Sequence, residues 1–394
     1  MQLPEHSVLG ASGASRWMVC PGSVGLAKGH TDEESFFARE GTAAHHFAAE
    51  CLDNDRDAWE YISDEPGKGY SFPDGDELFM SKDMADAVQV YLNFVRAFPG
   101  RNQHNHHVEV KFHCPDIHPS MFGTADDVYY DERERTLHVT DYKHGAGIVV
   151  DVKDNVQLMY YGAGMLQHLG LWGAVDTVNL TIVQPRGFHF DGPIRSWAIG
   201  VNDLDWWLYD QLVPAMYDAE ESNATESGEH CRFCPVRYHA CPQLLADMDE
   251  LEELITMVNT AKGGAKALTN KQLGRFIQLF DLAKIVAKAA NATAFIRLQD
   301  GKKIAGVKLA NGRTNRTWKD DAEKAIKAEL GTKAYSQPEL LTPAKIDALP
   351  GGVALTARYA YKPEGKLTVV SASDARVAIE KQDNKDLFKK VGKK

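Results

Sequence analysis

MFGTADDVYYDERERTLHVTDYK, residues 121–143, contains two strand patterns and the charged turn that separates them. Residues 121–130 and 136–142 are each short and rich in β-branched and aromatic side chains, which is typical of neighbouring strands. Asp126 lies in the first strand and Asp141 near the end of the second. Two carboxylates on neighbouring strands can therefore converge at one place on the sheet.

The segments on either side extend these strands into a larger sheet. Apolar residues at helical spacing predict helices over residues 34–52, 82–97 and 153–169. Further strand patterns fall at residues 107–112, 147–151, 177–184 and 195–199. More helices are predicted after residue 202, from about residue 247 and over residues 269–299. This order predicts an α/β fold in which helices flank a mixed central sheet.

The composition is that of a globular protein, since 44% of the 394 residues are apolar and 25% are charged. No run approaches the roughly 18 apolar residues of a membrane span. Residues 1–10 lack the basic and then apolar pattern of a signal peptide. We therefore expect a cytoplasmic protein without a membrane partner.

Charge divides the chain into an acidic and a basic part. Residues 1–260 contain 17 Lys and Arg against 42 Asp and Glu, whereas residues 261–394 contain 27 against 13. Such asymmetry suggests a polyanionic partner, because basic side chains release counterions from phosphates. A solvated lysine-rich surface would give the same count. The change of sign predicts a first domain over residues 1–246 and a basic, helical or α+β domain over residues 247–394.

The carboxylates at the strand ends suit a hard divalent cation, which prefers oxygen ligands. Such an ion polarises a phosphoryl oxygen and lowers the pKa of bound water, which is hydrolytic chemistry. Lys143 lies two residues beyond Asp141, so it points to the same side and could orient water or offset developing charge. An Asp-x-Lys tripeptide is common by chance, so its meaning depends on its neighbours.

Two helical motifs accompany these residues. Gly41-Thr-Ala-Ala-His45 lies in the first predicted helix, and Gln157-Leu-Met-Tyr-Tyr161 lies in the helix after the strands. With Gly-x-x-Asp and Asp-x-Lys they form an ordered set that resembles the RecB-like branch of the PD-(D/E)XK nuclease superfamily over residues 7–245. The resemblance implies a restriction-endonuclease-like core and a metal-dependent deoxyribonuclease.

The resemblance also implies a role for each motif residue. Mg²⁺ or Mn²⁺ would be held by His45, Asp126, Asp141 and the backbone carbonyl of Tyr142. Lys143 would act on the nucleophilic water, and Gln157 and Tyr161 would support the site and the DNA. Only the family spacing selects these ligands over the adjoining His46 and Asp127. Further side chains that could reach the site are Glu40 and Glu109.

Three of the six cysteines, Cys231, Cys234 and Cys241, fall within eleven residues, a spacing that suggests a metal site. Together with the distant Cys20, they resemble the split iron–sulfur arrangement of RecB-like exonucleases. The resemblance implies a [4Fe–4S] cluster that staples the two ends of the core. Zn²⁺ is the alternative, since His230 and His239 lie in the same segment. The remaining cysteines, Cys51 and Cys114, are expected to be ordinary thiols.

Beyond the core, residues 306–318 and the basic tail resemble an uncharacterised phage and prophage family in which a RecB-like nuclease carries this extension. Lys308, Arg313 and Arg316 offer phosphate contacts, and Trp318 offers a stacking surface for single-stranded or frayed DNA. A β-hairpin with an exposed basic face is the alternative interpretation.

The acidic first domain should confine DNA to a channel or an end-binding site. The resemblance then implies a DNA exonuclease of 5′→3′ polarity that serves phage recombination or replication in the host cytoplasm. Its partners would be linear DNA and a single-strand annealing protein, and a homo-oligomer is compatible with such an enzyme. An endonuclease for branched or flapped DNA and a non-catalytic DNA-end-binding protein remain open alternatives.

Overall fold

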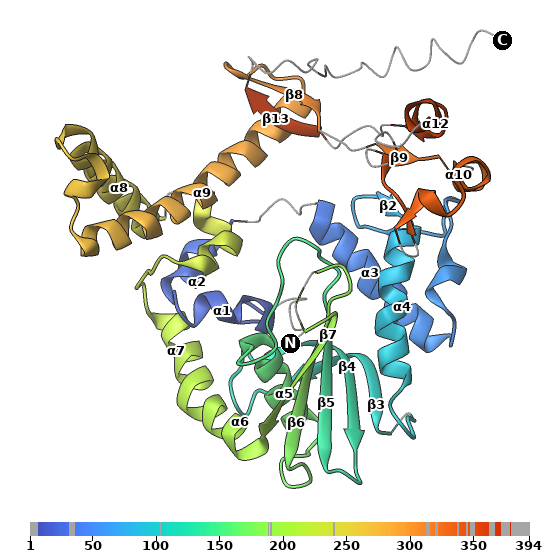
Figure 1. The fold of residues 1–394 in the computed structure, drawn as a ribbon. Coiled ribbons are helices and arrows are strands. Elements are labelled where there is room, and N and C mark those ends of the chain that lie inside the picture. Colours follow the sequence, from blue (N-terminus) through green and yellow to red (C-terminus); the bar gives the residue numbers. More distant parts are fainter. Residues whose placement is uncertain are drawn as a thin grey trace. The chain divides into compact units, whose positions relative to one another are not determined.

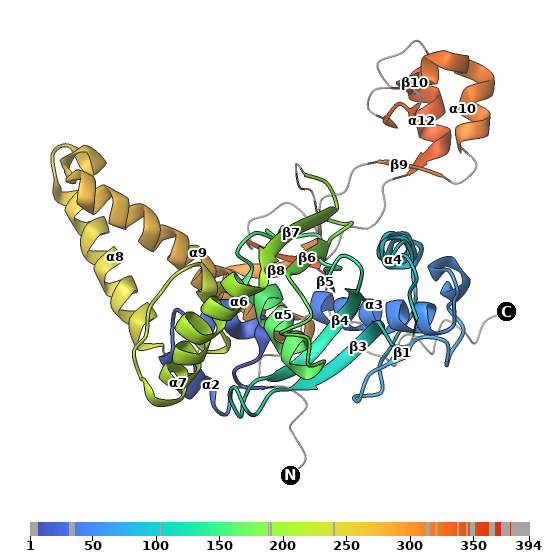
Figure 2. The same ribbon diagram turned by 90° about the horizontal axis from the view of Figure 1, so that it is seen from below.

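The computed structural model describes residues 7–30, 36–102, 104–187, 189, 191–238, 241–312, 316–319, 322–336, 339–343, 346, 351–361, 367–371 and 379. Residues Met1–Ala283 and Lys284–Lys394 form two compact units, so the division falls inside helix α9 (Asn270–Gln299). The charge pattern placed the boundary earlier, after residue 246. Helix α8 (Pro242–Thr260), which is acidic, therefore groups with the first unit (Figure 2).

The first unit is built on a five-stranded mixed sheet (Figure 1). Its strands, in spatial order, are β3 (His106–His113), β4 (Phe122–Asp131), β5 (Thr136–Tyr142), β6 (Thr177–Val183) and β7 (Ile194–Gly200). Strands β5 and β6 run parallel, and the other neighbours are antiparallel. A parallel pair needs a crossover, which helix α5 (Val156–His168) supplies. The mixed α/β sheet predicted from the sequence is confirmed.

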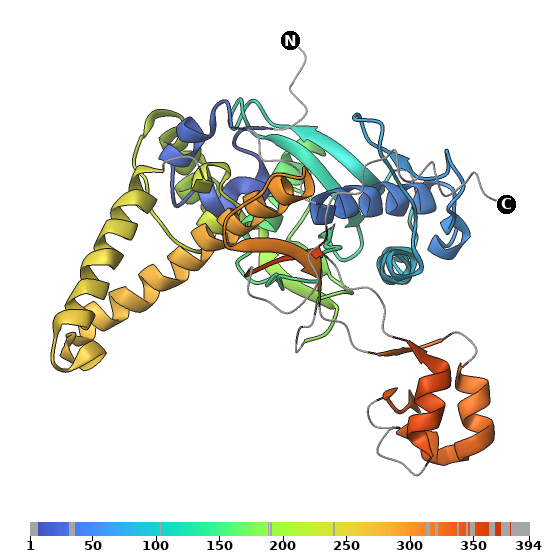
Figure 3. The ribbon, with the colours of Figure 1, turned by 90° about the horizontal axis from the view of Figure 1, so that it is seen from above.

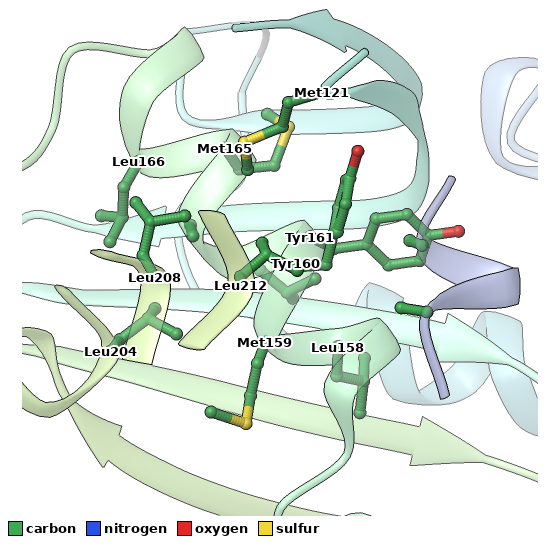
Figure 4. Packing of buried hydrophobic residues seen from close by; sticks show 14 of the residues in the cluster. Met121, Leu158, Met159, Tyr160, Tyr161, Met165, Leu166, Leu204, Leu208 and Leu212 are labelled. Atoms are coloured by element: carbon green, nitrogen blue, oxygen red, sulfur yellow. The ribbon is translucent and has the colours of Figure 1, made fainter. Parts of the chain in front are cut away.

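Helices cover both faces of this sheet. One face packs against α5 and the segment α6 (Val201–Trp207), η3 (Leu208–Leu212) and α7 (Val213–Glu221), and the packing is shown in Figure 4. The same core includes η1 (Ala11–Gly13) and α1 (Ala14–Trp17), which are followed by α2 (Gly22–Ala27). The other face packs against α3 (Phe36–Asp53) and α4 (Lys82–Arg96), where the Tyr91 and Tyr142 rings lie 5.1 Å apart.

Helix α5 is buried on nearly every side, because it lies between the sheet and α6–α7. Its glycines permit this close packing. A methyl group added at Gly164 would overlap the Phe112 ring of β3. The motif residues Gln157 and Tyr161 are therefore held on a helix that cannot shift without disturbing the core.

The strand predicted over residues 147–151 does not form, because these residues lie in a loop. In this loop, side chains and not a neighbouring strand form the hydrogen bonds to the backbone of Val150. The N–H of Val150 donates to Gln184 Oε1 at 3.1 Å, and its carbonyl accepts a hydrogen bond from Arg195 at 2.9 Å. The β-branched residues of this segment indicated a strand, but their backbone groups are satisfied without one.

The acidic excursion between α3 and α4 contains η2 (Ala58–Tyr61), β1 (Tyr70–Ser71) and β2 (Glu77–Leu78). After α7 come η4 (Glu229–Phe233) and η5 (Pro235–Tyr238), and η6 (Gly264–Ala267) lies between α8 and α9. Among the described helices, none has both the length and the apolar character needed to cross a membrane.

The described residues of the second unit form the end of α9, short strands, and the small helices α10 (Ala322–Leu330) and α12 (Gly352–Tyr359). Strand β8 (Val307–Asn311) pairs with β13 (Leu367–Ser371), and β9 (Thr317–Trp318) pairs with β12 (Ala360–Tyr361). The remaining elements are η7 (Gly331–Ala334), β10 (Tyr335–Ser336) and β11 (Glu339–Leu340). Because β8 and β9 pair with later strands, the described residues do not form the β-hairpin considered from the sequence.

Candidate metal centre

Three carboxylates lie in one row across the sheet. The register places residue 109 of β3 opposite residue 126 of β4, since Val108 pairs with Asp127 and Val110 with Ala125. Asp127 in turn pairs with Thr140 of β5, which places residue 126 opposite residue 141. Asp126 and Asp141 share the α5 face with Val128 and Val139 of their strands. Glu109 departs from the alternation of β3, because its φ of 47° turns the chain at this position and brings its carboxylate near Asp126.

Helix α3 adds an imidazole to this row. His45 Nδ1 lies 3.4 Å from Asp126 Oδ2 and 3.8 Å from Glu109 Oε1. One ligand atom from each of these three residues lies within 4.8 Å of the other two, close enough to share an ion. The buried face of α3, with Ala44, Phe47 and Ala48, fixes the position of His45 against the core. One nitrogen and several oxygens form a donor set that suits Mg²⁺ or Mn²⁺.

The electrostatics of the cluster fit a cation. Burial alone would lower the pKa of His45, but the Asp126 and Glu109 carboxylates raise it to about 10. Burial would raise the pKa of Asp126, but His45 and Lys143 lower it below its usual value. Burial raises the pKa of Asp141, with Lys143 acting in the opposite direction. Three carboxylates so close together hold excess negative charge that a divalent ion would offset.

Lys143 connects the carboxylates to α5. Its Nζ donates to Asp141 Oδ1 and to Gln157 Oε1, both at 3.0 Å. Gln157 Nε2 donates in turn to the Tyr161 hydroxyl at 3.2 Å. The residues of two sequence motifs thus form one hydrogen-bonded chain from β5 to α5. Nζ also lies 2.9 Å from Asp141 Oδ2, so it contacts both oxygens of this carboxylate. An ammonium has three protons, and one that is shared between the two Asp141 oxygens leaves another for a ligand.

His46 and Asp127, which adjoin the expected metal ligands in the sequence, have other partners than the metal cluster. Asp127 faces α4, and its Oδ1 lies 2.6 Å from His106 Nε2. His46 lies 3.6 Å from Glu50 and packs against the Tyr70 ring. Strand and helix periodicity therefore separate His45 from His46 and Asp126 from Asp127.

Glu109 belongs to the cluster, whereas the sequence named it only as a further possibility. Its φ of 47° lies in the left-handed region, which is unusual for a strand residue other than glycine. Such a conformation costs of order 1–3 kcal/mol and is found most often at functional sites. The alternation of residues 107–112 would have placed Glu109 on the face opposite Val110 and Phe112, and the left-handed conformation that brings it to Asp126 has no signal in the sequence.

Glu40 does not reach the cluster, because it forms an ion pair with Arg186 at 3.0 Å. Arg186 also contacts the Nε2 atom of His144, and His144 Nδ1 lies 2.9 Å from the Tyr142 hydroxyl. Burial, Arg186 and His45 lower the pKa of His144 to about 3, so this imidazole is neutral. The Glu40–Arg186–His144 network ties α3 to the loop after β6 and to the end of β5.

Tyr142 lies between this network and the carboxylate row. Its backbone N–H donates to Asp126 Oδ2 at 2.7 Å, and its ring lies 5.4 Å from that of His45. These contacts hold the residue whose carbonyl was the fourth expected ligand directly beside the cluster.

The cysteine segment after α7 packs against the N-terminal helices. Gly22 N–H donates to Ala224 O at 2.8 Å, and a methyl group at Gly22 would lie only 2.7 Å from Asn223. Glu226 N–H reaches Cys20 Sγ at 3.4 Å across more than 200 residues. The fold therefore brings Cys20 to the segment that contains the other cysteines, as the sequence predicted.

His230 lies between two of these sulfurs. Hydrogen bonds with Cys20 and Cys231 raise its pKa to about 10. Burial would raise the pKa of Cys20, but His230 and the Glu226 N–H lower it. Cys234 is buried at the end of η4, and Cys241 is half-buried at the start of α8. Among the described residues these four cysteines do not form a closed site, and His239 lies outside the described part.

The basic residues expected to bind DNA are in the second unit. Lys308 lies in β8 and Arg316 just before β9, whereas Arg313 lies outside the described residues. Trp318 packs against the core of this unit, and its indole N–H donates to Leu341 O at 3.2 Å. Trp318 is thus partly buried and held by the core of this unit, and the stacking surface suggested by the sequence stays a prediction.

A comparison with protein families finds a match that covers nearly the whole chain. One family model, described as "Protein of unknown function (DUF2800)", matches residues 6–377, which include the carboxylate row, the cysteine segment and most of the second unit. The chain therefore belongs to the DUF2800 family of proteins of unknown function.

Proposed function

We propose that the protein is a divalent-metal-dependent DNA exonuclease of the RecB-like PD-(D/E)XK class. The supporting observation is the convergence of His45, Asp126, Asp141 and Lys143, which come from three elements far apart in sequence. Each is the matching residue of one ordered motif. A structural ion-pair network would not require this combination of an imidazole from α3, carboxylates from β4 and β5, and a lysine directly after β5.

Mg²⁺ or Mn²⁺ would be held by His45, Glu109 and Asp126, whose ligand atoms lie within 4.8 Å of one another. Asp141, the further ligand implied by the sequence resemblance, is not one of these three and would complete the site from the neighbouring strand. When bound, such an ion polarises the scissile phosphoryl group and makes water more acidic. The Tyr142 N–H on Asp126 Oδ2 fixes the orientation of that carboxylate. Hydrogen bonds of this kind behind a ligand tune both its position and its affinity for metal.

Lys143 would act directly on the reacting groups. Asp141 and Gln157 each accept one of its protons and so direct the ammonium towards the carboxylate row. Its remaining proton can bind a nonbridging phosphate oxygen or orient the attacking water. Tyr161 keeps Gln157 in place, and Tyr161 is itself buried in the core. These two residues therefore position Lys143 as well as the substrate.

The reaction is hydrolysis of a phosphodiester. The water oxygen forms a new bond to phosphorus while the bond from phosphorus to the leaving nucleotide oxygen breaks. The water loses a proton to solvent or to a site carboxylate, and the leaving oxygen gains one. The products carry a phosphate on one side of the cut and a hydroxyl on the other.

The acidic balance of residues 1–260 favours a confined DNA path over binding across the surface. This supports an exonuclease that captures an end. The 5′→3′ polarity, the role in phage recombination or replication and the single-strand annealing partner rest on the sequence resemblance alone.

Cys20, Cys231, Cys234 and Cys241 would hold a [4Fe–4S] cluster, with Zn²⁺ as the competing occupant. The residues fit thiolate ligation in part. Backbone N–H groups of Glu226 and Gly228 donate to Cys20 and Cys231, each at 3.4 Å, as expected around anionic sulfur. When bound, the group would link the N-terminal helices to the segment after α7.

The test is a nuclease assay on end-labelled linear DNA and closed circular DNA, with Mg²⁺, with Mn²⁺ and with chelator. Wild type is compared with Asp141→Ala and Lys143→Ala, and DNA binding is measured in parallel. Degradation of linear DNA alone, dependent on metal and on Asp141, supports the exonuclease, and the label position gives its polarity. Cutting of circular DNA would replace the proposal with an endonuclease. Binding without cleavage under every condition would replace it with a non-catalytic end-binding protein.

A further inference from the structure

The second unit contains a basic groove of about 590 Å³. Its described lining residues are Lys319, Lys324, Ala325, Ala328, Arg358 and Tyr359. The three charged side chains among them are all cationic, and no described lining residue is acidic. Asp320 and Asp321 follow Lys319 in the sequence but lie outside the described residues. We call this feature the α10–α12 groove, because these two helices, side by side in Figure 3, supply most of its wall.

The groove has a fixed base. Helix α10 contributes Ile326, and α12 contributes Tyr359, to the small core that also contains Trp318. Lys319, directly after β9, donates its backbone N–H to Tyr359 O at 2.8 Å. Its Nζ donates to Arg358 O at 3.0 Å. These two hydrogen bonds hold the Lys319 side of the groove to the backbone of Arg358 and Tyr359, so this part of the groove is formed without a ligand.

Arg358 is oriented by a neighbouring ring. Its guanidinium carbon lies 5.0 Å from the centre of the Tyr359 ring, within the range of a cation–π contact. Such a contact uses the face of the guanidinium and leaves its N–H donors at the edges for other partners. A planar donor set of this kind suits phosphate oxygens.

Lys324 lies on the groove side of α10, and the nearest acidic side chain along that helix points elsewhere. Glu323 accepts a hydrogen bond from the Tyr335 hydroxyl at 3.1 Å. The wall next to Lys324 is made of Ala325 and Ala328, whose small side chains leave room for a bulky ligand. Positive charge on both walls and small residues between them favour an extended polyanion.

We infer that the α10–α12 groove binds the phosphodiester backbone of DNA. The inference deepens the proposed function, because DNA is the polyanion that the active site would cleave. Lysine and arginine contacts to phosphate are independent of base sequence, which suits an enzyme that degrades any linear DNA. The groove adds a phosphate-binding feature to the second unit, beside the partly buried indole of Trp318.

The experiment measures binding of the full-length chain to fluorescein-labelled single-stranded and duplex DNA by anisotropy, in chelator, so that turnover plays no part. The groove variants are Lys324→Ala and Arg358→Ala. The matched control is Lys327→Ala, an exposed lysine one turn further along α10 that does not line the groove. Thermal unfolding of each variant shows whether the fold is retained.

We expect both groove variants to weaken DNA binding severalfold and Lys327→Ala to match wild type. Each lost phosphate contact should also reduce the slope of log affinity against log salt by roughly 0.7–0.9. Equal effects of Lys324→Ala and Lys327→Ala would overturn the inference. So would displacement of DNA by inorganic phosphate or a free nucleotide at similar concentrations, because that would identify a small-anion site.

The experiments can reject the DNA-binding groove and the nuclease activity independently of each other. If groove variants bind DNA normally while wild type still cleaves it with Mg²⁺ or Mn²⁺, the groove is excluded and the nuclease stands. If groove variants lose binding while wild type never cleaves, the groove stands and catalysis is excluded.

Discussion

Asp126 and Asp127 are adjacent carboxylates with different surroundings. Asp126 lies beside His45 on the α5 face, and Asp127 pairs with His106 on the α4 face. Asp126→Asn should abolish metal-dependent cleavage, by at least about 100-fold, because even residues behind metal ligands contribute about 10–100-fold. The fold should also lose stability, because the Asp126 carboxylate is ion-paired with His45 and its pKa is lowered by the folded protein.

Asp127→Asn is the matched control for this experiment. It should retain cleavage but lower the free energy of unfolding by about 1–3 kcal/mol, because the buried hydrogen bond between Asp127 and His106 is weakened. Activity assays and urea unfolding of both variants measure the two effects. An inactive Asp127→Asn protein with an unchanged fold would show that the assignment of faces is wrong.

Arg186 is a residue that the sequence did not single out. It lies 146 positions from Glu40 in the chain, so no local pattern could have paired them. The motif residues could be found because each has a fixed spacing within one helix or strand. Arg186 and Glu109 depend on register and loop path, which only the folded chain defines.

Arg186 should act by positioning α3 relative to β5. Arg186→Met is expected to lower cleavage about 10–100-fold and to destabilise the protein, because Glu40 then lacks its cation. The double variant Glu40→Gln/Arg186→Met should recover stability without recovering activity. Arg39→Met is the control. Arg39 is next to Glu40 on α3, but it forms its ion pair with Asp74, which is outside the Glu40–Arg186–His144 network. Full activity in the double variant would leave the network with a structural role only.

At the scale of elements, periodicity identified α3, α4, α5 and the five strands of the sheet because each has one buried face or is buried throughout. The β-branched residues of segment 147–151 predicted a strand, but the structure has a loop there. There, Gln184 and Arg195 satisfy the backbone, so no neighbouring strand is required. Local sequence reports which side chains prefer a strand, but not which partner supplies the hydrogen bonds.

Two helix glycines should respond oppositely to the same substitution. A methyl group at Gly41 in α3 meets nothing within 4 Å, so Gly41→Ala should raise the free energy of unfolding by up to about 1 kcal/mol through helix propensity. At Gly164 in α5 the methyl group would overlap Phe112. Overpacking costs about 1–3 kcal/mol, more than the propensity gain, so Gly164→Ala should destabilise. Urea unfolding decides both signs, and a stabilised Gly164→Ala protein would contradict the packing described for α5.

At the scale of the whole molecule, charge and compactness divide the chain differently. The sign of the charge changes after residue 260, whereas the compact units separate at Ala283. Arg275 explains part of the difference, because it crosses from α9 to pair with Asp247 and Glu250 of α8. A basic residue that is paired with acidic ones belongs structurally with them, which a count along the sequence cannot show.

The cysteine segment joins the two ends of the first unit's chain. A link between Cys20 and Cys231 closes a loop of more than 200 residues, and a crosslink of that length stabilises by about 5 kcal/mol in the chain-entropy limit. Protein purified without oxygen should therefore contain iron and sulfide, and Cys20→Ser should lose both and melt at a lower temperature. Cys114→Ser is the control, because this buried thiol donates to Gly164 O far from the segment.

Metal analysis and thermal unfolding of the three proteins separate the possibilities. Iron with equimolar sulfide that is lost only in Cys20→Ser supports the staple, and zinc lost in the same way would assign the site to zinc. Cys20→Ser that melts like wild type and keeps its metal would contradict a cluster that spans both ends, because three remaining thiolates near η4 would then suffice. The hydrogen bonds that His230 makes with Cys20 and Cys231 predict that the metal is lost in Cys20→Ser, since both distant sulfurs contact one imidazole. The identity of the metal, iron or zinc, is decided by the metal analysis.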